Sequence, residues 1–274
     1  MAIVRHLAGV QAQDARAAPL AVRARGSGFG ASAVEAALAD GALVVAWLMR
    51  GTLHLVARED HNWLLALTAP RSRTMNARRL RQLGVDEARA ERALGEIEAT
   101  LPTERADLAA RLGCSRRQTA HLLLRAALDG VCVLGAGRRI VAAPRDGARG
   151  GLAELGRRYL AAHAPADDRD LAAWSGLPLR DARAALAAAG PAGPPDPQPL
   201  PPRLLPMYDE YLLGWRDRSF AVPEALTREV HPGGGILRAT AVTDGRITAT
   251  WSRAGGVPDA YAAELADVEA FLRE

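Results

Sequence analysis

Apolar and polar positions follow the same pattern twice in this chain, in residues 102–113 and again in residues 165–176. The two stretches align without gaps, and they share a proline, the run Asp-Leu-Ala-Ala and a closing glycine. In each copy this pattern predicts a short helix, a turn that contains the glycine, and a second helix. We therefore expect a repeated helix-turn-helix unit.

Local signals mark the helix ends within these copies. Thr103 is placed to cap the first helix of the first copy, and Gly113 is placed to end it. Ser115 and Gln118 have the spacing of a capping box for the second helix. In the second copy Gly190 follows an alanine-rich helix and should end it.

A helix precedes each copy, and a hairpin follows the first one. Residues 90–101 and 152–160 each keep one face apolar, which predicts the preceding helices. After the first copy, an apolar strand at 131–134, a glycine turn at 135–137 and a return strand at 138–143 predict a β-hairpin. Three helices and a hairpin make a winged helix-turn-helix unit.

The N-terminal region repeats this ending. A helix from Ser32 should finish at Asp40-Gly41, and strands at 43–49 and 52–57 flank a turn at Arg50-Gly51. This arrangement predicts a further winged-helix unit at the start of the chain.

The second half closes differently. The third unit lacks a wing, because residues 190–202 form a linker rich in proline and glycine. Further on, predicted strands at 236–242 and 246–251 flank Asp244-Gly245, a strong signal for a two-residue hairpin. A closing helix is expected at 259–272.

These patterns predict a mainly α fold with small β-hairpins, built from tandem winged helix-turn-helix units and a small C-terminal α+β domain. The expected segments are a first winged-helix unit at 1–60, an arginine-rich connecting helix at 61–84, a second unit at 85–145, a winged-helix-like third unit with its proline-rich linker at 150–200, and the C-terminal domain at 203–274.

Composition narrows the class of protein. The 274 residues are 49% hydrophobic, but no apolar run approaches the ~20 residues that span a bilayer, and Arg5 and His6 interrupt the N-terminal apolar stretch. We expect a soluble, cytoplasmic protein with no membrane partner.

Cys114 and Cys132 have no accompanying metal-ligand pattern, so we expect no metal and no disulfide. We expect the two cysteine side chains to contribute to packing.

All 35 basic residues are arginine, and the net charge is +4. Arginine grips phosphate with two parallel hydrogen bonds, which suits nucleic acid. A GC-rich genome would favour the same composition. Charge and composition alone therefore leave DNA binding open.

Two glutamines near the N-terminus, Gln11 and Gln13, are separated by one alanine and followed by Asp14. Residues two apart lie on one side of an extended segment, so the two amides could point together and hold a water molecule against a substrate. The alternative is that they are two surface glutamines. Asp14 also has two interpretations. It could add electrostatic stabilisation, or it could cap the segment that follows.

The sequence resembles the AlkZ/YcaQ-like DNA glycosylase family of winged-helix DNA-binding proteins. The resemblance runs in family order over nearly the whole chain. The matching segments are 10–14 with the glutamine pair, 47–56 with its Arg-Gly-Thr-Leu-His run, 159–163, 174–177, 205–214 with its Tyr-Asp-Glu-Tyr run, 216–219, 244–246 and 250–251.

This resemblance implies a metal-free, cofactor-free monofunctional glycosylase in which Gln11 and Gln13 are the catalytic residues. Its partner would be alkylated double-stranded DNA, and we expect a monomer associated with the nucleoid. Known members of the family remove bulky N7-alkylguanines or unhook crosslinks, and some protect antibiotic producers from their own genotoxins. An open groove would probe such a lesion in place and avoid part of the cost of flipping the base.

The other candidates divide between supporting and DNA-binding roles. Asp14 and His54 are the supporting candidates, with His54 either buttressing the glutamines or serving as a structural histidine. The DNA-binding candidates are basic or polar residues of the first wing, the connecting helix and the second recognition helix, for which a solvated face is the alternative: Arg50, Thr52, Arg78, Arg79, Arg81, Arg117, His121 and Arg125. Asp209 and Glu210 have two interpretations: they could orient arginines or water near the DNA, or they could form a structural salt bridge, which is the interpretation we favour.

The chain departs from the family pattern at three places. Only ten residues precede the glutamine motif where relatives have another helix, prolines replace strands between 190 and 202, and the sequence after Trp251 is short. We expect each departure to loosen the site, because a displacement of ~1 Å can cost most of a rate. Two other functions are alternatives to the glycosylase. The protein could be a non-catalytic winged-helix DNA binder, or its groove could sequester a DNA-reactive natural product.

Overall fold

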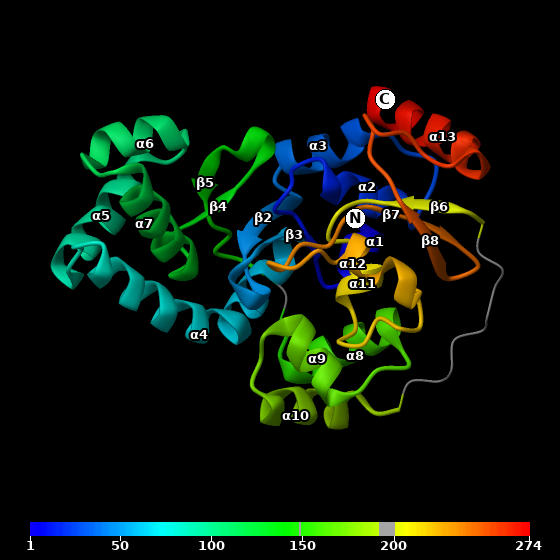
Figure 1. Cartoon of the computed structure of the whole chain (residues 1–274). Coiled ribbons are helices and arrows are strands. Elements are labelled where there is room, and N and C mark those ends of the chain that lie inside the picture. The colour runs from blue at the N-terminus through cyan, green and yellow to red at the C-terminus, as the bar shows by residue number, and fades with distance from the viewer. Residues whose placement is uncertain (148, 192–200) are drawn as a thin grey trace. The chain divides into compact units, whose positions relative to one another are not determined.

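The computed structural model describes residues 1–147, 149–191 and 201–274 (Figure 1). The chain forms two compact units. The first comprises Ala36–Gly151 together with Met1, and the second combines Ala2–Glu35 with Leu152–Glu274. The chain passes between them within α3 (Ala31–Ala39). The boundaries of the five segments expected from the sequence differ from those of these two units. The division into five segments stays a prediction.

The first unit contains both predicted wings, and they share one sheet. β2 (Leu43–Trp47) pairs antiparallel with β3 (Leu53–Ala57), and β4 (Cys132–Leu134) pairs antiparallel with β5 (Ile140–Ala142). β2 also pairs with β4, which gives the order β3-β2-β4-β5 within this unit. The sequence predicted both hairpins but not that they would join.

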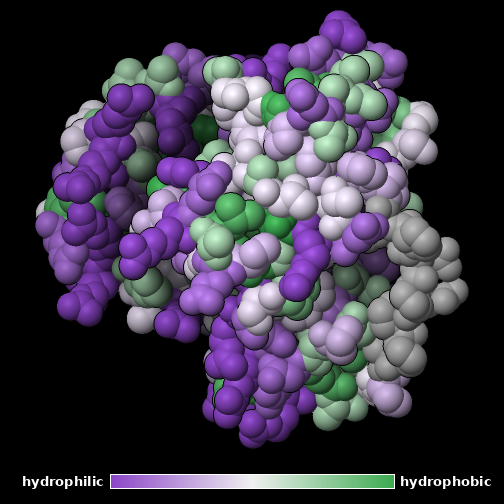
Figure 2. Space-filling view, turned by 45° about the vertical axis from the view of Figure 1, so that its right-hand side comes forward, coloured by the Kyte–Doolittle hydropathy of each residue, from purple (hydrophilic) through white to green (hydrophobic). Residues whose placement is uncertain are grey.

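Four helices complete the first unit: α4 (His61–Gln82), α5 (Glu87–Thr100), α6 (Arg105–Leu112) and α7 (Arg116–Leu128). Leu80, Ala90 and Leu122 are buried together, so α4, α5 and α7 share one apolar cluster. In the space-filling view, hydrophilic residues dominate the surface over these helices, on the left side (Figure 2).

Local chemistry explains most of the helix ends. Ser115 and Gln118 form the predicted capping box at the start of α7, and Gly113 ends α6 with φ 55°. The prediction that Thr103 caps α6 is wrong, because Glu104 holds the N-cap position. The backbone of Thr103 instead exchanges hydrogen bonds of 2.9 Å with Ile140 in β5. This tertiary pairing extends the wing and outweighs the local capping signal.

The second unit contains the third helical group: α8 (Leu152–His163), α9 (Asp168–Ser175) and α10 (Leu179–Ala189). α8 and α10 approach closely at Gly156, where a Cβ atom would lie 2.3 Å from the backbone oxygen of Ala185. Gly190 ends α10 as predicted. Most of the predicted proline-rich linker, residues 192–200, lies outside the described residues.

A three-stranded antiparallel sheet in the order β6-β7-β8 forms the rest of the second unit's framework: β6 (Arg203–Leu205), β7 (Thr240–Thr243) and β8 (Arg246–Thr250). Asp244 and Gly245 have φ values of 47° and 73°, which fits the left-handed turn that their sequence predicts. The sheet buries Leu204 and Ala241 against α13 (Ala262–Arg273), the predicted closing helix. The prediction of a mainly helical chain with small hairpins is confirmed.

The second unit also contains two short helices, α11 (Glu210–Leu213) and α12 (Thr227–Val230). Tyr208 and Tyr211 pack against the apolar cluster of this unit. Among the residues that the structure describes, no helix has both the length and the apolar character needed to cross a membrane.

Candidate functional site

The glutamine pair lies in the second unit, on a short connection between two helices. α1 (Ala2–His6) is followed by a turn in which Ala8 and Gly9 have φ values of 55° and 138°. The chain then forms β1 (Val10–Gln11), bends, and enters α2 (Ala17–Arg23). The left-handed turn ends α1 and sends the chain directly into the motif.

The two glutamines have different environments. Gln11 is buried, with 5% of its surface exposed, whereas Gln13 is exposed. The extended segment is shorter than the sequence suggested, because the chain already bends at Gln13. One amide therefore belongs to the framework, and the other faces solvent.

Asp14 makes a local hydrogen bond just before α2. Its Oδ1 accepts a hydrogen bond of 2.9 Å from the backbone N–H of Arg16, just before α2 begins. Such a bond stabilises the turn that follows the motif. Asp14 is itself exposed, as is the neighbouring Gln13.

Glu210 fixes the backbone of Gln11. Its Oε1 accepts a hydrogen bond of 3.0 Å from the Gln11 N–H, and its Oε2 accepts one of 2.8 Å from the Trp174 indole N–H. Only 1% of Glu210 is exposed. A buried carboxyl group with two directional partners holds the motif more rigidly than apolar packing would.

Asp209, next to Glu210, forms a buried ion pair. Its two oxygens accept hydrogen bonds of 2.7 and 3.0 Å from Arg25, which follows α2, and Oδ1 also accepts one from the Tyr211 N–H at the start of α11. Burial opposes the charge on Arg25, but attraction to Asp209 outweighs it and raises the pKa of Arg25 above its ordinary value. The sequence reading of a structural salt bridge fits Asp209.

Sequence reasoning missed the role of Glu210. The contact joins residues 199 positions apart, so no local pattern reveals it. The available signal was two adjacent acids inside an otherwise apolar and aromatic run, because carboxyl groups in such surroundings are retained only with specific partners.

Aromatic rings support the Trp174 side of this network. The ring centroids of Tyr159 and Trp174 are 5.2 Å apart, and those of Tyr159 and His163 are 4.8 Å apart. The Tyr159 hydroxyl donates to the Gly214 carbonyl at 2.5 Å. Burial lowers the pKa of His163 to about 4, so this ring is neutral at pH 7 and packs as an aromatic residue. The cluster therefore fixes the indole that reaches Glu210.

His54 lies in the other unit, on β3. It is 1% exposed, and its Nδ1 donates a hydrogen bond of 3.0 Å to the Thr52 carbonyl. Burial first, and the charge of Arg50 second, lower its pKa to about 3. The ring is neutral at physiological pH, which suits a structural residue; its predicted support of the glutamines stays a prediction.

The low pKa of His54 predicts that acid lowers the free energy of unfolding. The unfolded histidine takes up a proton near pH 6.5, whereas folded His54 stays neutral down to about pH 3. Because the folded pKa is the lower one, protons favour the unfolded chain, and stability falls as the pH drops below 6.5. We expect His54 to account for about 2 kcal/mol of loss between pH 7 and pH 5. Urea unfolding at both pH values checks this.

The matched variant is His54→Asn, whose amide can replace the Nδ1 donor. It should show a smaller difference in unfolding free energy between pH 7 and pH 5 than the wild type. An identical pH dependence in both proteins would contradict the assignment.

The DNA-binding candidates all lie in the first unit, and the structure gives several of them internal partners. Thr52 donates to the Met49 carbonyl, and Arg79 donates to Gln82. His121 contacts Asn76, and Arg125 pairs with both Glu87 and Asp129. Arg50 has φ 57° at the wing turn. The candidates with exposed side chains are Arg78, Arg81 and Arg117.

Arg117, His121 and Arg125, the three candidates on α7, therefore differ in how available their side chains are to DNA. Arg125 is 18% exposed and committed to two carboxylates, whereas Arg117 is exposed and available to a phosphate. In the described part of the chain, no group of three or more His, Cys, Asp or Glu residues could hold a metal ion.

Comparison with known proteins adds to this geometry. The family model described as DNA glycosylase AlkZ-like matches residues 4–257. Among solved structures, the Streptomyces sahachiroi DNA glycosylase AlkZ is similar, with a TM-score of 0.73 and 23% sequence identity, over 97% of this chain and 88% of that chain. At that identity the likeness shows a shared fold. No curated protein sequence matches the chain.

Proposed function

Because this chain belongs to the AlkZ-like DNA glycosylase family, we propose that it is a monofunctional glycosylase that removes N7-alkylated guanine from double-stranded DNA. Gln11 and Gln13 are its catalytic residues in this proposal. The observation that carries it is the unequal pair: Gln11 is buried and held by Glu210, and Gln13 beside it is exposed to a substrate.

The chemistry needs little acid catalysis. Alkylation at N7 makes the purine cationic, so the bond between N9 and C1′ breaks with its electron pair going to N9, and the base leaves neutral. The sugar then carries the positive charge, and water adds to C1′ and releases a proton to solvent. The enzyme has to orient that water and stabilise the sugar cation.

An amide side chain suits the orienting task. Each glutamine offers one acceptor and two donors, enough to fix a water molecule, although it is a poor base. In this proposal Gln13 contacts the water, and Gln11 fixes the direction of the segment. The exposed carboxylate of Asp14 lies beside Gln13 and stabilises positive charge on the sugar.

Exposed arginines supply the sequence-independent part of the affinity for DNA. Arg78, Arg81 and Arg117 are exposed on α4 and α7 of the first unit. We expect replacement of all three with alanine to weaken duplex binding and to lower the slope of log affinity against log salt by about 0.9 for each phosphate that the protein no longer neutralises. A salt titration by fluorescence anisotropy measures this. Unchanged affinity and slope would remove these residues from the DNA-binding surface.

Base release tests the proposed activity. The substrate is a duplex oligonucleotide with one N7-methylguanine, and alkali converts each abasic site into a strand break. We expect release above the spontaneous rate by the wild type, and release at the spontaneous rate by Gln11→Ala/Gln13→Ala.

The contradicting outcomes are no release by the wild type, or equal release by the double variant. Duplex binding with steep salt dependence but without release would make the protein a non-catalytic winged-helix binder. Crosslink unhooking and self-resistance stay predictions from the family resemblance.

A further inference from the structure

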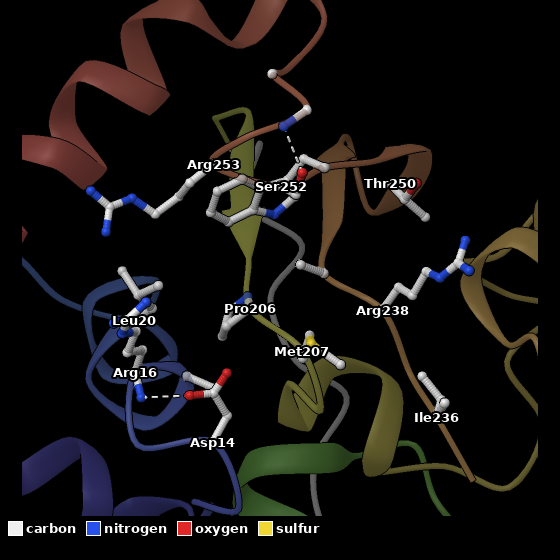
Figure 3. A pocket seen from close by; sticks show the side chains of 15 residues that line it. Asp14, Arg16, Leu20, Pro206, Met207, Ile236, Arg238, Thr250, Ser252 and Arg253 are labelled. Atoms are coloured by element: carbon white, nitrogen blue, oxygen red, sulfur yellow. Dashed lines mark hydrogen bonds between the residues drawn. The ribbon is translucent and has the colours of Figure 1, made fainter. Parts of the chain in front are cut away.

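A pocket that is separate from the glutamine motif opens in the second unit. Its volume is about 620 Å³, and its lining comes mainly from residues 217–224, from α12 and from Arg246 of β8. The cavity beside the glutamine motif, about 660 Å³ in volume with Asp14 and Met207 in its lining, shares no residue with this pocket (Figure 3). We call the separate recess the Arg218 pocket.

Arg218 is half-buried in this pocket and has no carboxylate partner among the described residues. Its Nε atom donates a hydrogen bond to the Leu212 carbonyl in α11, and this is the one hydrogen bond that its guanidinium group makes to the described part of the chain. Burial lowers the pKa of Arg218 below its ordinary value, because the surroundings do not compensate its charge. Arg23 and Arg25 of the same unit, by contrast, each pair with a carboxylate. An anion is the partner that Arg218 lacks.

A second arginine lines the same pocket. Arg246 is exposed, and its Nη1 donates a hydrogen bond of 3.1 Å to the Phe220 carbonyl, an acceptor without charge. Two carboxylates also belong to the lining. Asp217 accepts hydrogen bonds of 2.9 and 3.0 Å from the backbone N–H and the hydroxyl of Ser219, and Glu224 is exposed. Within the described residues neither carboxylate pairs with an arginine of the pocket, so both guanidinium groups can bind a ligand's phosphate or carboxylate.

The rest of the lining is largely apolar. Val222, Val230 and Leu237 belong to a buried apolar cluster of this unit, and they line the pocket together with Pro223. Pockets that enclose small organic molecules have volumes of about 300–1,000 Å³, mainly apolar walls and a few converging polar groups. A DNA strand would satisfy the arginines through its phosphates but would leave the apolar wall uncovered. A small molecule with an apolar body covers it.

We propose that the Arg218 pocket is a binding site for a small organic anion. Arg218 and Arg246 bind its one phosphate or carboxylate group, and the apolar wall holds its aromatic or aliphatic body. The site is distinct from the glutamine motif, and its ligand is not the DNA substrate.

Calorimetric titration of the full chain without DNA tests this site. The probe is 1-naphthyl phosphate, which has an aromatic body and a phosphate. 1-Naphthol lacks the phosphate, and inorganic phosphate lacks the aromatic body. We expect 1-naphthyl phosphate to bind at least about tenfold more tightly than either of the other two, because charge-assisted hydrogen bonds and apolar burial each contribute that much. Failure of 1-naphthyl phosphate to bind, or affinity equal to that of either partial probe, would overturn the proposal.

Two exposed residues of the lining should change this affinity in opposite directions. Thr227→Glu adds a negative charge to the pocket and should weaken binding of 1-naphthyl phosphate at least about tenfold, whereas Glu224→Gln removes one and should strengthen binding about threefold. Ala187→Glu is the matched control, because Ala187 is an exposed residue of α10 outside the pocket. Unchanged affinity in both lining variants, or an equal loss in the control, would overturn the proposal.

A further pair of variants and a competition experiment separate the proposed ligand from DNA. Arg246→Ala should weaken binding of 1-naphthyl phosphate about tenfold, and Arg228→Ala, which removes an exposed arginine outside the lining, should not. An undamaged DNA duplex should leave the affinity for 1-naphthyl phosphate unchanged. Displacement of the probe by the duplex would assign the pocket to DNA phosphates and overturn the proposal. None of these measurements depends on base release, so their outcome is independent of the proposed glycosylase activity.

Discussion

Glu210→Ala is expected to lose base release and a large part of the folding stability together. The change removes the acceptor for the buried N–H groups of Gln11 and Trp174. Each orphaned buried donor costs about 1–3 kcal/mol. The freed motif also loses its position, and a shift of ~1 Å lowers a rate by about 100-fold. Urea unfolding and single-turnover release measure the two effects.

Conservative variants separate position from stability. Glu210→Gln keeps one acceptor oxygen, and we expect it to recover part of the release rate with little change in KM. Trp174→Phe removes the indole hydrogen bond but leaves the contact between Glu210 and Gln11. It should lose stability and keep most of its rate per folded molecule. A full release rate in Glu210→Ala would show that Gln11 needs no such anchor.

Arg25→Met is expected to destabilise the second unit by about 3–5 kcal/mol, because it leaves the carboxylate of Asp209 buried without its ionic partner. Asp209 is 2% exposed in its side chain, and Arg25 is 23% exposed. The pair connects the end of α2 to the start of α11, which carries Glu210. The loss should therefore also loosen the glutamine segment.

A double variant tests the cause of this loss. Asp209→Asn keeps an acceptor for the Tyr211 N–H but removes the charge. Arg25→Met/Asp209→Asn should recover most of the stability that Arg25→Met removes, and the coupling energy from the four proteins measures the pair. Simple additivity of the two single changes would contradict the account.

Features with local signals were predictable from the sequence. The hairpin at Asp244-Gly245, the capping box at Ser115 and the helix end at Gly113 follow from the conformational preferences of a few adjacent residues. Thr103 shows the limit of such signals. It has a capping side chain, but its backbone pairs with Ile140, and a sheet contact 37 positions away decides its conformation.

The candidate site depended on contacts that local patterns do not contain. Glu210 meets Gln11 across 199 positions, and the cavity combines residues near 14–20, 206–207 and 236–256. The second compact unit likewise joins the first 35 residues, apart from Met1, to the second half of the chain. Local sequence patterns therefore singled out the glutamines as candidates but could not supply the residues that hold them.

The unpaired and paired arginines illustrate the same point. A basic stripe on a predicted helix indicated DNA contact for Arg117 and Arg125 alike. Arg125 is engaged by Glu87 on α5 and by Asp129, whereas Arg117 is exposed. Spacing predicts the face of a helix that a side chain occupies, but the partner on a neighbouring helix is set by tertiary packing.

Gln13→Ala tests the central claim most directly, because Gln13 is exposed and its loss should leave folding and DNA affinity unchanged. Gln82→Ala is the matched control on an exposed glutamine of α4. The measurement is the single-turnover rate of N7-methylguanine release from duplex DNA. We predict a loss of about 100-fold or more in Gln13→Ala and none in Gln82→Ala. An unchanged rate in Gln13→Ala would contradict the account.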